Sequence, residues 1–80
     1  MLEEIKTSRF VVGTKQTIKA VEHEEAALVY LAQDASDYMK NKIIQCCKAK
    51  NVPIQLVETM EQLGNSCGIC RGAATAAIIK

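Results

Sequence analysis

Two cysteines separated by two residues, Cys67 and Cys70, stand near the end of the sequence, and Arg71 follows them directly. A Cys-x-x-Cys pair can act as a disulfide oxidoreductase, and it can also supply half of the ligands of a tetrahedral zinc site. The redox function needs the pair at a helix N-terminus, where the helix dipole lowers the thiol pKa. Here the pattern predicts a short helix before the pair and a strand after it, so this function is the weaker alternative.

A zinc site would need two further ligands. The other cysteines, Cys46 and Cys47, are adjacent in a helical pattern, so their side chains point about 100° apart and suit core packing better than a shared ion. His23 is the one histidine of the sequence. We therefore expect neither a zinc site nor a Ser-His-Asp triad, and we expect His23 to be a surface residue at a helix end.

The composition is typical of one globular domain. The chain has 80 residues, of which 24% are charged, and a net charge of +1. This length gives one core, and this net charge by itself does not indicate nucleic acid. No apolar run approaches the roughly 18 residues of a membrane span, and the acidic start does not resemble a secretory signal. We expect a single domain over residues 1–80 in the cytoplasm, with reduced thiols.

Helical and extended patterns alternate along the chain, which predicts an α/β protein built as a three-layer α/β/α sandwich. Thr14 is expected to cap the second helix, Ser36 or Asp37 the third, and Gly64 is expected to end the fourth. The third helix has a predicted buried stripe of Met39, Ile43, Cys46, Cys47 and Lys50. The expected helices cover residues 2–7, 14–24, 37–50 and 59–64, and the expected strands cover 10–12, 27–32, 54–57 and 73–79.

The stretch Gly13-Thr14-Lys15-Gln16-Thr17-Ile18-Lys19 begins the predicted second helix. A glycine permits a sharp turn from strand to helix, and the helix N-terminus offers free backbone N–H groups to an anion. Lys15 and Lys19 share one helix face, with Gln16 beside them. This face is either merely solvated or a small platform that binds phosphate through amides and a guanine edge through Lys and Gln.

Four short motifs together resemble the kink-turn RNA-binding ribosomal protein superfamily, the L-seven-Ae and L-thirty-e group, and especially its small bacterial members. The resemblance extends from about residue 5 to residue 80. It implies a mixed four-stranded sheet, no enzymatic activity, and recognition of a sharply bent RNA with tandem sheared G·A pairs beside a bulge. We expect no cofactor and no metal. The motifs are Gly13 to Lys19, Ala32-Gln33-Asp34-Ala35, Asn51-Val52-Pro53, and Leu63-Gly64-Asn65-Ser66-Cys67-Gly68-Ile69.

The first RNA-binding segment that the resemblance implies is the helix motif Gly-x-Asn-Glu-x-x-Lys, which maps onto Gly13, Lys15, Gln16 and Lys19. Lys15 replaces the usual Asn and Gln16 the usual Glu. Lysine can still donate to guanine O6 or to phosphate. Glutamine keeps one carbonyl acceptor, but it lacks the charge that strengthens hydrogen bonds.

The second implied segment is the loop before the last strand, which closes over the bulged nucleotides in the family. Ile69 would contact an unstacked base, and Arg71 would reach phosphate or stack on a base. Cys67 would pack, and Met60 replaces a basic residue that is common in the family. The candidate RNA-binding residues are Gly13, Thr14, Lys15, Gln16, Lys19, Gly68, Ile69, Cys70, Arg71 and Gly72.

These residues predict a compact site. Lys15, Lys19 and Arg71 should converge at one end of the sandwich, while the acidic cluster of Glu22, Glu24 and Glu25 should lie elsewhere. The expected partner of the monomer is a structured RNA containing a kink-turn, in the ribosome or in another transcript. Two alternatives stay open: a dithiol redox or metal-binding protein that uses Cys67 and Cys70, and an adaptor that keeps the fold without binding RNA.

Overall fold

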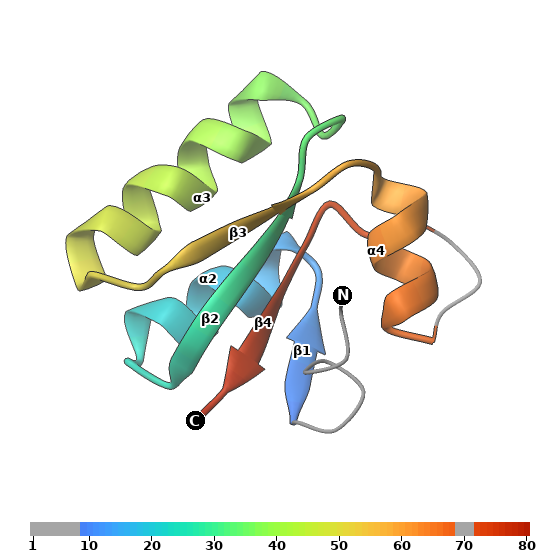
Figure 1. Ribbon diagram of the computed structural model, residues 1–80. Helices are drawn as coiled ribbons and strands as arrows, with labels where there is room; N and C mark the ends of the chain where they lie inside the picture. The colour runs from blue at the N-terminus through green and yellow to red at the C-terminus, as the bar shows by residue number, and fades with distance from the viewer. Residues whose placement is uncertain (1–8, 69–71) are drawn as a thin grey trace.

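The computed structural model describes residues 9–68 and 72–80 (Figure 1). The predicted helix at residues 2–7 lies outside these ranges. The predicted alternation of strands and helices is confirmed within them. The elements are β1 (Phe10–Val12), α2 (Thr14–Glu22), β2 (Ala26–Ala32), α3 (Asp37–Lys50), β3 (Ile54–Val57), α4 (Met60–Ser66) and β4 (Thr75–Ile79).

The four strands form one mixed sheet in the order β1-β4-β2-β3. β4 is antiparallel to both of its neighbours, whereas β2 and β3 are parallel to each other. β2 was predicted to be buried on both faces because it is a continuous apolar run, and Val29 to Ala32 are buried. The mixed four-stranded sheet expected from the resemblance is therefore present.

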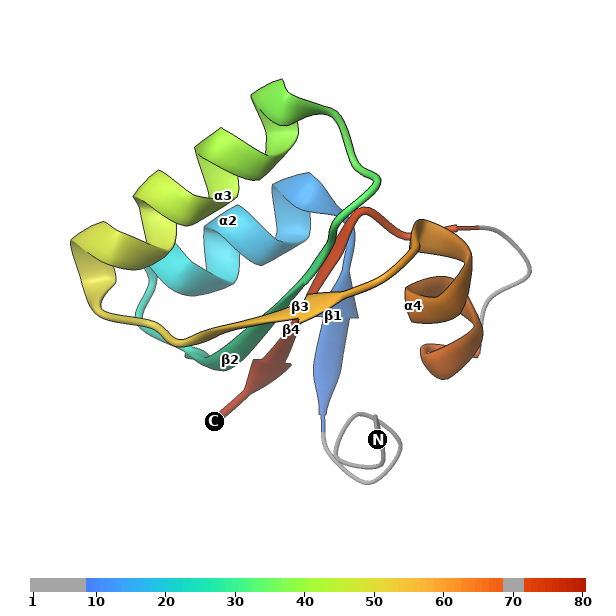
Figure 2. The ribbon, with the colours of Figure 1, turned by 45° about the horizontal axis from the view of Figure 1, so that its top comes forward.

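The sheet carries helices on both faces, as Figure 2 shows: α2 and α3 cover one face and α4 covers the other. Successive residues of β4 point to opposite faces. Ala76 accordingly packs in the cluster on the α4 side, with Tyr30 and Leu63, while Ala77 packs in the cluster on the α2–α3 side. The predicted three-layer α/β/α sandwich is confirmed. None of the helices within residues 9–68 and 72–80 is long and apolar enough to cross a membrane.

The helix ends agree with the predictions in part. Ser36 caps α3, because its side chain accepts a hydrogen bond from the Met39 N–H, and Asn51 ends it with a positive φ of 58°. The prediction for Thr14 was wrong: Gly13 is the cap of α2, and Thr14 is the first helical residue. Gly64 does not end α4, which continues to Ser66.

The buried stripe of α3 is narrower than predicted. Ile43 and Cys47 are buried, and Met39 and Cys46 are half-buried. Lys50 is exposed, because an ammonium group without a partner loses its hydration when it is buried. Similarly, α2 ends at Glu22, and His23 is its exposed C-terminal cap, as expected for this histidine.

Candidate functional site

The turn between β1 and α2 is held firmly by the backbone of Gly13. Its φ of 105° lies in the region that favours glycine. Its N–H donates to the Thr75 carbonyl oxygen at 2.9 Å, and its own carbonyl oxygen accepts from the Thr17 N–H at 2.9 Å. The N-terminus of α2 has no side-chain cap and no acidic residue in its first turn. The first-turn amides therefore remain available to an anion.

The polar residues of α2 lie on two flanks of the helix. Lys15 and Lys19 line a hollow of about 690 Å³ between α2 and α3, together with Lys42. Gln16 and Lys19 line a second hollow of about 420 Å³ on the β1 side, together with Arg9. Lys19 thus lies between the two flanks and can serve both.

The predicted separation of lysines and acidic residues is wrong for Glu22 and for Glu25. Glu22 lines the same hollow as Lys15 and Lys19. The reason is helical spacing, because residues three, four and seven positions apart share one side of a helix. Glu25 lines the hollow on the β1 side, together with Gln16 and Lys19. Glu24, with a φ of 58°, follows the end of α2 and lines neither hollow.

The two segments that were expected to form one site meet at a third hollow, of about 390 Å³. Gly13 and Thr14 line it from the start of α2, and Gly72 lines it from the segment that precedes β4. Met39, near the start of α3, also lines it. Sequence reasoning read Met39 only as part of the buried stripe of α3.

Of the remaining residues of the second segment, Gly68 alone lies within the described residues. Ile69, Cys70 and Arg71 lie outside the described residues, so their predicted roles stay predictions. Gly68, with a φ of 78°, follows Cys67, which is the C-terminal cap of α4. Gly68 is thus at the opposite end of α4 from the hollow that Gly72 lines.

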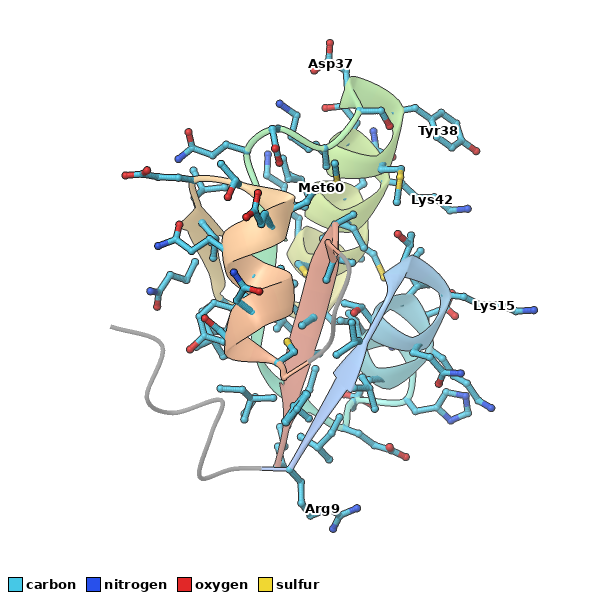
Figure 3. The ribbon with its side chains drawn as sticks, turned by 90° about the vertical axis from the view of Figure 1, so that its right-hand side faces the viewer. Arg9, Lys15, Asp37, Tyr38, Lys42 and Met60 are labelled. Atoms are coloured by element: carbon cyan, nitrogen blue, oxygen red, sulfur yellow. The ribbon has the colours of Figure 1, made fainter. Side chains whose placement is uncertain are left out.

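A chain of contacts fixes Gly72 against the start of α4. The Met60 N–H donates to Asp34 Oδ1 at 2.7 Å, and the Met60 carbonyl oxygen accepts from the Ala73 N–H at 2.9 Å. A Cβ at position 72 would lie 3.1 Å from the Met60 Cβ, so a larger residue would displace this backbone. Figure 3 shows Met60 at the start of α4. Asp34 belongs to the motif Ala32-Gln33-Asp34-Ala35, but no role was predicted for it from the sequence.

The thiols in the described residues have raised pKa values, whereas a redox centre needs a thiol with a lowered pKa. Cys67 lies at the C-terminal end of α4, where the helix dipole disfavours a thiolate, and burial raises the pKa of its thiol. Burial and then the charge of Glu22 raise the pKa of Cys46. Within the described ranges, no group of three His, Cys, Asp or Glu side chains could hold a metal ion.

The sequence and the fold are those of a known family. Residues 2–80 match the model of the ribosomal protein L7Ae/L30e/S12e/Gadd45 family. The chain belongs to this family, as the four motifs indicated.

Individual relatives support the same conclusion. An RNA-binding protein of Caldanaerobacter subterraneus is 49% identical over 67 residues, covering 84% of this chain and 82% of its own. An RNA-binding protein of Halalkalibacterium halodurans is 47% identical over 70 residues, covering 88% of this chain and 85% of its own. The solved structure of the 15.5 kDa RNA-binding protein of Giardia lamblia is similar with a TM-score of 0.85 and 25% identity, covering 99% of this chain and 67% of its own.

Proposed function

We propose that this protein is a non-enzymatic RNA-binding protein that recognises kink-turn RNA and stabilises its bent form. The observation that carries the proposal is the hollow in which Gly13, Thr14 and Gly72 come together. A bent RNA presents its G·A pairs and its bulge close together, so a protein that reads both needs two segments at one end of the molecule. The names of the relatives support RNA as the ligand class.

Each group at the start of α2 has a distinct role in this proposal. The free amides of the first turn bind a phosphate. Lys15 donates to guanine O6, and the Gln16 carbonyl oxygen accepts from guanine N–H groups. Lys19, which lies between the two flanks of α2, neutralises a backbone phosphate. The contact to the guanine N–H groups needs the sheared G·A geometry, because a Watson–Crick pair directs these N–H groups toward the partner base.

The hollow at the end of the sandwich suits a nucleotide of the bulge. Met39 gives it an apolar wall, and the backbone of Gly13 and Gly72 permits a close approach. Ile69 and Arg71 complete this contact in the roles that the resemblance implies. Because the protein binds the bent RNA better than the extended RNA, binding shifts the RNA population toward the bent form. The RNA belongs to the ribosome or to another structured transcript.

A gel-shift comparison tests the proposal. One RNA contains a kink-turn, and its partner has the G·A pairs replaced by Watson–Crick pairs. We expect the kink-turn RNA to bind at least about tenfold more tightly, since one lost base contact costs about 1–3 kcal/mol. A Lys19→Ala variant should weaken binding, whereas Lys48→Ala, an exposed lysine on α3, should not. Equal affinity for the two RNAs would reject kink-turn recognition.

A further inference from the structure

A groove between α2 and α3 leads away from the proposed site. The two helices lie side by side on one face of the sheet (Figures 1 and 2). Thr14 lines both the hollow at the end of the sandwich and the hollow between α2 and α3. Ile18, Glu22 and Lys42 line the hollow between α2 and α3 and also a fourth hollow, of about 370 Å³, which extends to Lys50. The shared residues show that these hollows are adjacent, and we call the two hollows between α2 and α3 the α2–α3 groove.

Lysines border the α2–α3 groove on both sides. Lys15 and Lys19 come from α2, and Lys42 and Lys50 come from α3. All four are exposed, and Glu22 is the acidic residue that lines the groove with them. In Figure 3, Lys15 and Lys42 project to the same side of the molecule.

In the described parts of the chain, none of these lysines forms an ion pair with an acidic group. The ion pair found there joins Lys40 to Asp37 at 3.4 Å, outside the groove. The Lys42 Nζ lies 5.9 Å from the ring centroid of Tyr38. This contact leaves the positive charge of Lys42 intact. The groove therefore carries an excess of positive charge, although the whole chain has a net charge of only +1.

The layer on the other face of the sheet, which contains α4, carries negative charge. The stretch from Glu58 to Ser66, which includes α4, contains Glu58 and Glu61 and no basic residue. Among the described helices, the charges are thus segregated by layer, with the positive excess along α2 and α3. An anionic partner that contacts the end of the sandwich gains more by turning along the groove than by turning toward α4.

We propose that the α2–α3 groove binds the phosphate backbone of the RNA stem that adjoins the kink-turn. This inference rests on the proposed function and extends its footprint, since Lys15 and Lys19 belong to both the site and the groove. Lys42 and Lys50 are the new contacts. Lysine suits this role because its ammonium group is a mobile point charge that binds phosphate without reading sequence.

The walls of the groove favour RNA over an acidic protein segment. A docked amphipathic helix needs deep pockets for large apolar anchors. The apolar residues of the groove are Ile18 and Cys46, which are half-buried, and Ala49, which is small. Glu22 would repel a phosphate next to it, so the RNA backbone should follow the α3 side of the groove, where Lys42 and Lys50 lie.

The test compares two protein variants with equal charge on two RNAs. Lys42→Gln/Lys50→Gln removes two charges from the groove. Lys48→Gln/Lys80→Gln removes two charges from exposed lysines that line none of the groove hollows. One RNA has stems that stop close to the kink, and in the other both stems are extended. The measurement is the dependence of log Kd on log salt concentration.

On the RNA with extended stems, we expect the salt slope of the groove variant to be smaller by about two than that of the wild type. Each lost phosphate contact lowers the magnitude of this slope by about 0.9. The affinity of the groove variant for that RNA should fall about tenfold or more at low salt, and hydroxyl-radical protection of the stem should be lost. The control variant should keep the wild-type slope on both RNAs. Circular dichroism melting checks that both variants are folded.

The outcomes separate this inference from the proposed function. Equal slopes for the groove and control variants would show that the groove does not contact RNA. A protein would then be the partner to test there. An equal loss on the short and extended RNAs would also overturn it, because Lys42 and Lys50 would then act at the kink itself. Failure of the wild-type protein to distinguish kink-turn RNA from its Watson–Crick partner would instead reject the proposed function.

Discussion

The Gly13 N–H donates a hydrogen bond to the Thr75 carbonyl oxygen over 2.9 Å, which ties the start of α2 to the first residue of β4. The Thr75 Oγ1 in turn donates to the Tyr30 carbonyl oxygen at 2.6 Å, in the neighbouring strand β2. Thr75 is fully buried. One residue in the middle of the sheet therefore sets the position of the α2 tip relative to the chain that arrives from Gly72.

Thr75→Val should lower stability but not RNA affinity. Valine has nearly the same shape, but it cannot donate to the Tyr30 carbonyl oxygen. We expect the free energy of unfolding to fall by about 1 kcal/mol. The backbone bond to Gly13 does not need the hydroxyl group, so the affinity for kink-turn RNA should stay within about twofold of wild type. Urea denaturation and gel shift measure the two quantities, and unchanged stability would contradict the role of the hydroxyl group.

Gly13→Ala should lower both the stability of the protein and its affinity for RNA. The φ of 105° strains any residue with a Cβ, which costs about 1–3 kcal/mol of stability. Relief of this strain would move the first-turn amides, so kink-turn RNA should bind less tightly. Asn51→Ala is the matched control, because Asn51 also has a positive φ, of 58°, but lies at the far end of α3. The control should lower stability alone, and equal RNA affinities for Gly13→Ala and wild type would argue against the amide site.

Asp34→Ala tests the contacts that hold Gly72. The carboxylate accepts from the Met60 N–H at 2.7 Å, much as a helix cap does, so its removal should cost about 1 kcal/mol of stability. Asp34→Asn keeps an acceptor oxygen and should recover most of this loss. If the contact positions Gly72 for RNA, affinity should fall with Asp34→Ala and return with Asp34→Asn. A stability loss without any change in affinity would assign Asp34 to folding only.

Gln16→Glu should increase selectivity for the kink-turn. A carboxylate accepts guanine N–H hydrogen bonds more strongly than an amide does. We expect the affinity ratio between kink-turn RNA and its Watson–Crick partner to rise about tenfold, in line with a charge-assisted bond. Gln55→Glu makes the same charge change on an exposed residue of β3, away from the groove, and should leave the ratio unchanged. An unchanged ratio for Gln16→Glu would mean that Gln16 does not contact the G·A pairs.

Cys47 should make stability fall at alkaline pH. Burial, and next the neighbouring Cys46, raise the pKa of the Cys47 thiol from 9.0 to about 11. The unfolded chain releases this proton at lower pH than the folded chain, so unfolding is favoured as the pH rises from 9.0 towards 11. Below the unfolded value the full stability is present. Cys47→Ala should be less stable at neutral pH but should lose less on going to alkaline pH, as denaturant midpoints would show.

Regular elements could be predicted because they leave periodic patterns. α3 has the predicted bounds, because Ser36 and Asn51 mark both of its ends. The Gly13 cap was missed because Thr14 is the commoner kind of capping residue, and a polar residue next to a glycine does not show which of the two turns the chain. Local patterns of this kind do not reveal which distant residues touch.

The contacts that organise the site depend on tertiary structure. Asp34 and Met60 are 26 positions apart in the chain, and no local pattern joins them. Met39 was assigned to the core because it fits the helical spacing, yet it also faces the hollow at the end of the sandwich. The groove between α2 and α3 needs the relative placement of two helices, which sequence spacing within either helix does not contain.

The position of β4 in the sheet has a consequence for how the molecule forms. β4 is the most C-terminal described strand, yet it lies between β1 and β2. Its pairing with β1 closes a loop of most of the chain, so this step carries a large entropic barrier and should come late in folding. A nascent chain that has not yet released residues 75–79 would leave β1 unpaired. The α2 tip would then acquire its final orientation only when the last strand inserts, because the Gly13 N–H bonds to Thr75 in that strand.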